Sequence, residues 1–196
     1  MPVGVPKIII HYDDDKDPEC NELYRRRVLI LGGEINPEVA NVLTGVLLFF
    51  NIVDPIKKFK FFINSLGGSV IDGVALYDTI DTLDAPVDTI VLGIAASMAC
   101  FVLNAGTSRI AFPNARVIMH QPSSPYLDKK DAEIFLEVRE MTRMQHVIIE
   151  SFSKKTLKPY MEIKADMKRD FSMSAIEAIE YGIVDLIAGK DIFKFP

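Results

Sequence analysis

The chain has 196 residues, and its 49% of apolar and 25% of charged residues are ordinary for a globular protein. A net charge of -5 disfavours a nucleic-acid partner, and no apolar run reaches the roughly 20 residues of a membrane span. The N-terminal residues carry neither a secretion signal nor a transit peptide rich in Arg and Ser, so we expect the protein to act in the compartment that makes it.

Two cysteines, Cys20 and Cys100, are too few for a disulfide framework, and the sequence lacks the Cys/His spacing of a zinc site. A reduced compartment is therefore expected. The apolar neighbours of Cys100 predict a buried thiol rather than a reactive one.

Strands and helices are expected to alternate in a single domain over residues 21–196, after an N-terminal loop segment at residues 1–20. Short apolar runs predict strands at Val28–Leu31, Phe59–Ile63, Val87–Leu92, Arg116–Met119 and Ile183–Leu186. Helical spacing and capping residues predict helices at residues 37–51, 70–83, 97–104 and 129–154, and another from the capping box Ser174–Glu177 to Gly182.

This alternation of helices with continuous apolar strands predicts an α/β fold whose strands are covered on both faces. The helix at 129–154 is long for such a domain. Its apolar stripe ends at Ile148 and Phe152, while Glu140 and Arg143 are expected to be exposed. Two arrangements stay open, because the helix either projects and packs against a neighbour or lies across the sheet.

His120 is the one histidine of three that ends a predicted strand. The carboxyl ends of strands are where α/β proteins place their sites, and a neutral imidazole is the usual base that activates a hydroxyl. His11 falls in a polar terminal segment, and His146 is expected on the long helix as a surface or packing residue. A structural role for His120 is the alternative.

Ser97 lies within Gly93–Ala99, a pattern of strand, tight turn and helix. Small neighbours would let a substrate backbone approach the hydroxyl, and the helix start turns the Met98 N–H outward, as a tetrahedral oxyanion requires. An ordinary helix N-cap serine explains the position equally well. Alanines at 95 and 99 exclude the GxSxG motif of α/β-hydrolases.

The segment Asn64–Gly68 also joins a strand to a helix, and its two glycines allow the backbone to approach a ligand closely. We expect the N–H groups of Gly68 and Met98 to form one oxyanion hole. A phosphate-binding loop is a rival interpretation, but its sequence patterns are absent, and a tight turn is the structural alternative.

Asp170 could accept a hydrogen bond from His120 and hold its tautomer. Asp166 is a nearby competitor for this role. On spacing alone, a surface ion pair of Asp170 with Lys168 or Arg169 is the other interpretation.

Together these segments resemble the ClpP family of self-compartmentalised serine peptidases, over about residues 23–188. Four ordered motifs carry the resemblance: residues 63–68 (INSLGG), 93–99 (GIAASMA), 116–122 (RVIMHQP) and 169–175 (RDFSMSA). The resemblance implies Ser97 as nucleophile, His120 as general base and Asp170 as the residue that orients the base. It also implies oxyanion donors at Gly68 and Met98, and no metal or other cofactor.

The same resemblance implies a ClpP/crotonase-like fold with a handle helix near 129–154, assembled into two stacked seven-membered rings of identical or related subunits. A Hsp100-type Clp ATPase would consume ATP and feed unfolded proteins into the chamber, and assembly is expected to order the triad. The opening residues 1–7 resemble the plastid-encoded branch, which implies the chloroplast stroma, with a bacterial cytoplasm as the alternative.

Three positions depart from the family pattern. Leu66 stands where proline would restrict the φ angle, Ala99 replaces a common glycine, and Lys60 replaces an aromatic residue near the ATPase-docking surface. Two other functions stay open: a catalytically silent structural subunit of a mixed ring, and a crotonase-type acyl-CoA enzyme, which would give no reason for a Ser/His/Asp set.

Overall fold

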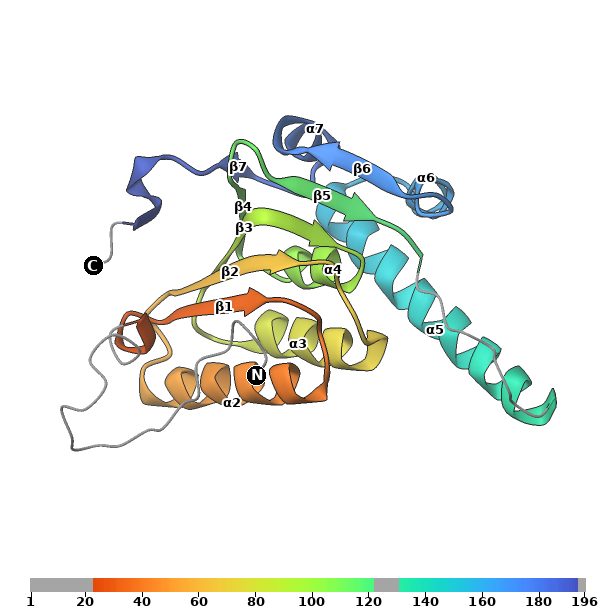
Figure 1. The fold of residues 1–196 in the computed structure, drawn as a ribbon, viewed down its shortest axis with the longest axis horizontal. Coiled ribbons are helices and arrows are strands. Elements are labelled where there is room, and N and C mark those ends of the chain that lie inside the picture. The colour runs from red at the N-terminus through yellow and green to blue at the C-terminus, as the bar shows by residue number, and fades with distance from the viewer. Residues whose placement is uncertain (1–22, 122–130, 194–196) are drawn as a thin grey trace.

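A seven-stranded sheet forms the centre of the computed structural model, which describes residues 23–121 and 131–193 (Figure 1). The strand order is β1-β2-β3-β4-β7, with β5 paired to β3 and β6 paired to β5. The strands are β1 (Val28–Gly32), β2 (Phe59–Ser65), β3 (Val87–Ala96), β4 (Ser108–Ala111), β5 (Arg116–Met119), β6 (Phe171–Ser174) and β7 (Leu186–Ile187). The predicted N-terminal loop segment lies outside the described residues.

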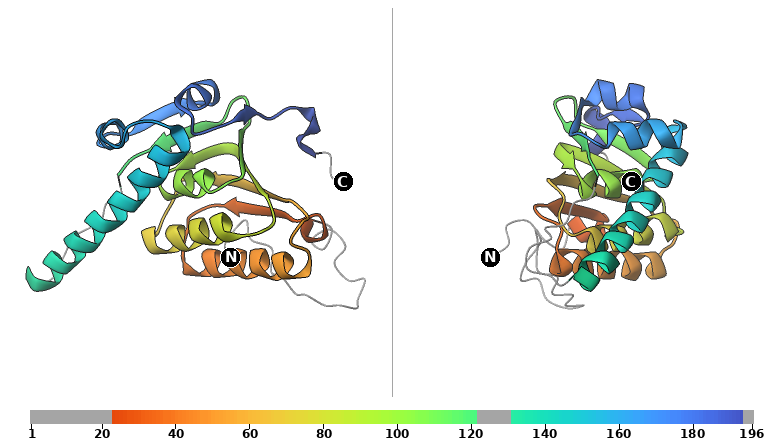
Figure 2. Two further views of the ribbon diagram at one scale, coloured as in Figure 1. Left: turned by 180° about the vertical axis from the view of Figure 1, so that it is seen from behind. Right: turned by 90° about the vertical axis from the view of Figure 1, so that its right-hand side faces the viewer.

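Helices α2 (Pro37–Val53), α3 (Val70–Thr82) and α4 (Met98–Asn104) lie together on one face of the sheet (Figures 1 and 2). The remaining helices are α5 (Asp131–Thr156), α6 (Tyr160–Asp166), α7 (Ala175–Tyr181) and the 3-10 turn η1 (Lys190–Phe193). The predicted start signals are confirmed, since the Asn36 side chain accepts from Val39 N–H and Ser174 forms a capping box with Glu177. Gly182 ends α7 in the left-handed region, as expected.

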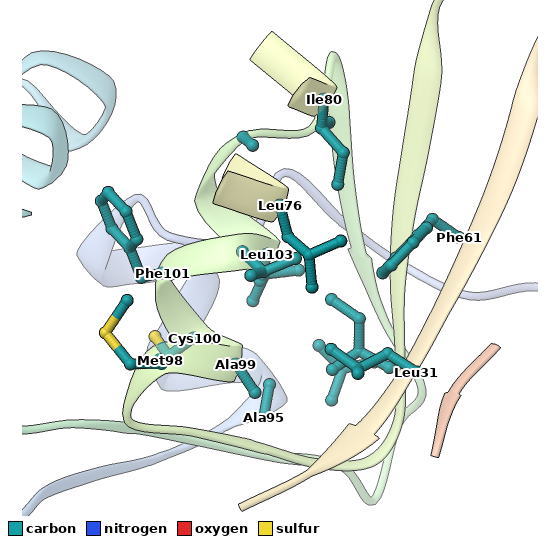
Figure 3. Packing of buried hydrophobic residues seen from close by; sticks show 14 of the residues in the cluster. Leu31, Phe61, Leu76, Ile80, Ala95, Met98, Ala99, Cys100, Phe101 and Leu103 are labelled. Atoms are coloured by element: carbon teal, nitrogen blue, oxygen red, sulfur yellow. The ribbon is translucent and has the colours of Figure 1, made fainter. Parts of the chain in front are cut away.

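Alternation along the strands sends side chains to two different apolar clusters. Leu31 and Phe61 point toward the helices, where Leu76 and Phe101 complete a buried cluster (Figure 3). The other face carries a smaller buried cluster, Val28, Phe62, Ile90 and Ile110, against which Ala188 and Ile192 of the C-terminal segment pack. The helices cover one face, as predicted, and the C-terminal segment packs against part of the other face.

The long strand β3 changes partner along its length. Its first half, Asp88–Val91, pairs in parallel with β4, and its second half, Ile94–Ala96, pairs in parallel with β5. Strand β5 in turn pairs antiparallel with β6. These pairings bring the carboxyl ends of β2, β3 and β5 and the beginning of β6 to one edge of the fold.

Helix α5 projects from the body and does not lie across the sheet, while its packing against a neighbour stays a prediction (Figures 1 and 2). Its C-terminal part is anchored by Ile148 and Phe152, each 2% exposed, whereas Val138 further out is 41% exposed. Glu140 and Arg143 form an exposed ion pair, as expected. Among the described residues, no helix is long and apolar enough to cross a membrane.

The predicted strand at Ile183–Leu186 is wrong, because strand β7 begins only at Leu186. The N–H groups of Ile183 and Val184 both donate to Ala178 O, so these two residues close the end of α7 instead of pairing in the sheet. Strands β4 and β6 and helix α6 were not predicted. Each is four to seven residues long, too short to develop a clear apolar period.

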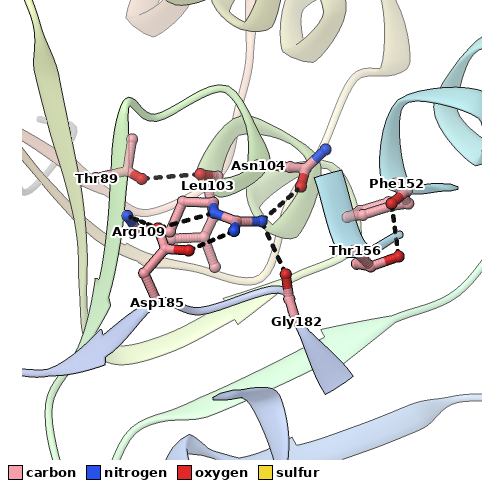
Figure 4. Close-up of polar contacts among 8 residues, drawn as sticks. All are labelled: Thr89, Leu103, Asn104, Arg109, Phe152, Thr156, Gly182 and Asp185. Carbon is pink, nitrogen blue, oxygen red and sulfur yellow. Dashed lines mark hydrogen bonds and ion pairs between the residues drawn. The ribbon is translucent and has the colours of Figure 1, made fainter. Parts of the chain in front are cut away.

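A buried polar network ties the sheet to the C-terminal part of the chain (Figure 4). The Arg109 guanidinium holds the Asp185 carboxylate with two hydrogen bonds and donates to Gly182 O at 2.9 Å. Asn104, at the end of α4, donates to Ser151 Oγ of α5 at 2.9 Å. The helix that follows Ser97 is therefore held at its far end by strand β4 and helix α5.

Candidate active site

Ser97 lies at the sharp turn between β3 and α4, with a φ of 55° and a ψ of -126°. Its side chain makes no capping hydrogen bond, which removes the N-cap explanation for this serine. Its backbone N–H donates to Ile118 O of β5 at 3.0 Å. A non-glycine residue with positive φ stores strain of about 1–3 kcal/mol, a feature that clusters at functional sites. The hydroxyl is half-buried and is not used by the local backbone.

The loop after β2 packs directly against this turn. A Cβ atom on Gly67 would lie 2.8 Å from Ser97 Cβ and 2.8 Å from Ala96 O, so only glycine fits there. The loop is also bonded to the backbone of Ile35, which donates to Gly67 O at 2.8 Å and accepts from Ser69 N–H at 2.9 Å. The glycine loop is therefore fixed by backbone hydrogen bonds and packs tightly against the turn that carries Ser97.

The two predicted oxyanion donors are available within the part of the chain that the structure describes. Gly67 N–H is taken by Ser65 Oγ at 3.1 Å, whereas Gly68 N–H and Met98 N–H donate to no acceptor among residues 23–121 and 131–193. The Met98 side chain packs against helix α3, since a Cβ atom placed on Gly73 would lie 2.7 Å from Met98 Cε. The backbone amide of Met98 is thus separated from its buried side chain.

Cys100 is not a competing nucleophile. It lies fully buried in α4, and burial raises the pKa of its thiol because the thiolate cannot be solvated. The prediction that Cys100 is buried is confirmed.

His120 directly follows β5, beside the end of β3. Ala96, the last residue of β3, pairs with Ile118 of β5. Ser97 therefore comes directly after the end of β3, and His120 lies two residues after Ile118 on the neighbouring strand. Ordinary strand spacings put the α-carbons of Ser97 and His120 within roughly 6–8 Å of each other. His146, by contrast, is exposed on α5 and contacts Tyr160 Oη at 3.0 Å, as a surface residue.

Asp170 directly precedes β6. Met119 and Phe171 form the terminal pair of the antiparallel β5–β6 ladder, so His120 and Asp170 are the residues that directly adjoin this pair on the two strands. Both residues therefore lie at the same end of the β5–β6 pair.

The competing carboxylate is already occupied, since Asp166 accepts a hydrogen bond from the Tyr181 hydroxyl at 2.7 Å. Asp170 is exposed and makes no ion pair within the described residues, so the surface ion-pair interpretation finds no support there. In the same residues no hydrogen bond yet joins Ser97, His120 and Asp170. The segment that follows His120, residues 122–130, lies outside the described residues.

Known proteins are similar to this chain along nearly its whole length. A family model described as Clp protease matches residues 13–191. The chain belongs to the Clp protease family. It is therefore a serine-type endopeptidase by class, and the observed α/β architecture agrees with the ClpP fold inferred from the four motifs.

Curated members of the family cover the chain almost end to end. A Lotus japonicus protein named ATP-dependent Clp protease proteolytic subunit is 43% identical over 194 residues, which span 96% of this chain and 99% of that protein. A protein with the same name from Chaetosphaeridium globosum is 44% identical, and the match spans 96% of this chain and 96% of that protein. Another from Triticum aestivum is 42% identical, and the match spans 99% of this chain and 93% of that protein.

Reasoning from the sequence did not single out two residues that shape this Clp protease site. Ser65 holds Gly67 N–H, and Asn64 Oδ1 accepts from Ile94 N–H at 3.2 Å. An Asn–Ser pair just before two glycines is a usable signal, because short polar side chains commonly hold turn backbone.

Proposed function

We propose that this chain is a catalytically active proteolytic subunit that hydrolyses peptide bonds with Ser97, His120 and Asp170. The observation that carries the proposal is the strained, uncapped serine beside His120 and against a glycine loop with a free N–H. Two outward amides at Gly68 and Met98 complement the charge of a tetrahedral intermediate rather than that of a ground-state carbonyl.

In the proposed reaction His120 takes the proton of Ser97 Oγ as this oxygen attacks the peptide carbonyl. The N–H groups of Gly68 and Met98 stabilise the oxyanion, and His120 passes its proton to the leaving amine, which departs as the acyl-enzyme ester forms. A water molecule, deprotonated by His120, then releases the carboxylic acid and restores Ser97. Asp170 orients the imidazole throughout, and no metal or cofactor takes part.

The proposed setting is a ring-shaped assembly. Relatives carry the words "ATP-dependent" and "subunit" in their name, while the sequence here lacks nucleotide-binding loop patterns. We therefore assign ATP use to a Hsp100-type Clp ATPase that delivers unfolded proteins. We assign α5 to the contact between two stacked heptameric rings of identical or related subunits, in which the triad hydrogen bonds would close. The plant and algal relatives favour the chloroplast stroma over a bacterial cytoplasm.

Covalent labelling separates this proposal from its main rival, a catalytically silent subunit of a mixed ring. A fluorophosphonate reacts only with an activated serine, so the intact assembly should carry the label on Ser97, located by tandem mass spectrometry. His120→Ala is expected to slow labelling by roughly 100-fold or more, because the general base is lost. A chain that stays unlabelled while neighbouring subunits react would establish the silent role instead.

A further inference from the structure

Strand β3 contains a bulge just before the nucleophile turn. Ile63 of β2 pairs with Val91, whereas Ser65, two residues later, pairs with Ala95, four residues later. The bulge coincides with the point at which β3 exchanges β4 for β5 as its partner. Without the bulge, the register that sets β5 and its terminal His120 beside Ser97 would change.

The exposed side chain of Asn64 lies against this bulge. Asn64 Oδ1 accepts from Ile94 N–H at 3.2 Å, and a Cβ atom on Gly93 would lie only 2.7 Å from the same oxygen. A side chain at position 93 would therefore displace this amide from Ile94 N–H. It also satisfies the first N–H of the β3 segment that pairs with β5.

Asn64 therefore links the two halves of the proposed oxyanion hole. On one side it precedes Ser65, whose hydroxyl shapes the glycine loop, and on the other it fixes Ile94, three residues before Ser97. The structure assigns Asn64 a positioning role: through the Ile94 amide it sets the distance between the Gly68 N–H and the Ser97 hydroxyl. This assignment rests on the proposed peptidase function and acts only through the backbone.

A double-mutant cycle on the assembled full chain tests this role. Asn64→Ala should lower kcat for a short fluorogenic peptide by roughly 10-fold to 100-fold with KM changed less than about threefold, since misplacement by a fraction of an ångström affects the transition state most. Asn64→Asp keeps the acceptor oxygen and should stay within about fivefold of the parent kcat. Gly93→Ala should be as damaging as Asn64→Ala.

The combination of both changes gives the decisive comparison. In the Asn64→Ala background the clash with position 93 is gone, so Gly93→Ala should add less than about a threefold further loss. Fully multiplicative losses, or a parent-like kcat for Asn64→Ala, would overturn the positioning role.

Asn51→Ala is the matched control, because Asn51 Oδ1 also accepts a long-range backbone N–H, that of Ala85, at 3.0 Å. Ala85 precedes the opposite end of β3 from Ser97, so this variant should lose stability without losing kcat. Equal kcat losses in Asn51→Ala and Asn64→Ala would reduce Asn64 to a structural residue.

Ser97→Ala in the same series separates the positioning role from the proposed function. If Ser97→Ala keeps activity, the proposed function fails. If Ser97→Ala is inactive and Asn64→Ala keeps the parent kcat, only the positioning role fails.

Discussion

Replacing Ser97 with alanine is expected to lower kcat/KM for peptide hydrolysis by roughly 10^4-fold or more, because the nucleophile of the acyl-enzyme route is removed. Binding of the substrate should change little, since Gly68 N–H, Met98 N–H and the strand edges stay in place. Hydrolysis of a short fluorogenic peptide by the assembled protein measures this loss. A residual activity within about tenfold of the parent would mean that another group attacks the peptide.

A second serine provides the matched control for this substitution. Ser174 is a true N-cap whose hydroxyl accepts from Glu177 N–H, whereas Ser97 caps nothing. Ser174→Ala should therefore cost about 1 kcal/mol of unfolding free energy and leave kcat unchanged. Ser97→Ala should show the reverse, full stability with lost activity, and urea unfolding of both variants at one protein concentration checks the pair.

Arg109→Met is expected to cost about 2–3 kcal/mol of unfolding free energy. Arg109 is 8% exposed and its guanidinium bonds Asp185 twice, so its removal leaves this carboxylate without its hydrogen-bonding cation. The loss should stay below that of a fully buried pair, because the Asp185 side chain is still 35% exposed and partly solvated. Arg143→Met, which breaks the exposed pair with Glu140, should cost less than about 1 kcal/mol in the same urea series.

The Arg109 effect should depend on pH in a defined direction. Burial favours the neutral acid, but hydrogen bonds from Arg109 outweigh it and hold the pKa of Asp185 below its ordinary value. A lowered pKa in the folded state means that the stabilisation is complete above the unfolded pKa, near about 4, and is lost as the pH falls through the folded value. Parent and Arg109→Met should therefore converge on acidification, and a gap that widens below about pH 4 would contradict the ion-pair account.

Much of the fold follows from local chemistry that a sequence displays. Asn36 and Pro37 mark the start of α2, and the capping box at Ser174 marks α7, because capping depends on residues only three positions apart. The final strand was misplaced for the converse reason. Ile183 and Val184 are as apolar as strand residues, but their N–H groups complete the end of α7, a choice set by the conformation of Gly182.

The candidate site divides in the same way. Ser97, His120 and the glycine loop lie at ends of strands that the sequence predicts, so their proximity could be expected from the sheet. The contribution of Asn64 could not be foreseen, because it depends on the two-residue register shift between β2 and β3. The resemblance already favoured Asp170 over Asp166, whereas the hydrogen bond from Tyr181 that occupies Asp166 became visible only in the structure.

The most direct measurement of the central claim uses a peptide chloromethyl ketone, which engages an attacking serine and then alkylates the imidazole beside it. The account predicts that the reagent inactivates the assembled protein with one alkyl group per chain on His120, and that Ser97→Ala slows this alkylation by roughly 100-fold or more. Alkylation at His146 or Cys100, or alkylation of His120 at an unchanged rate without the Ser97 hydroxyl, would contradict the convergence of these two side chains on one carbonyl.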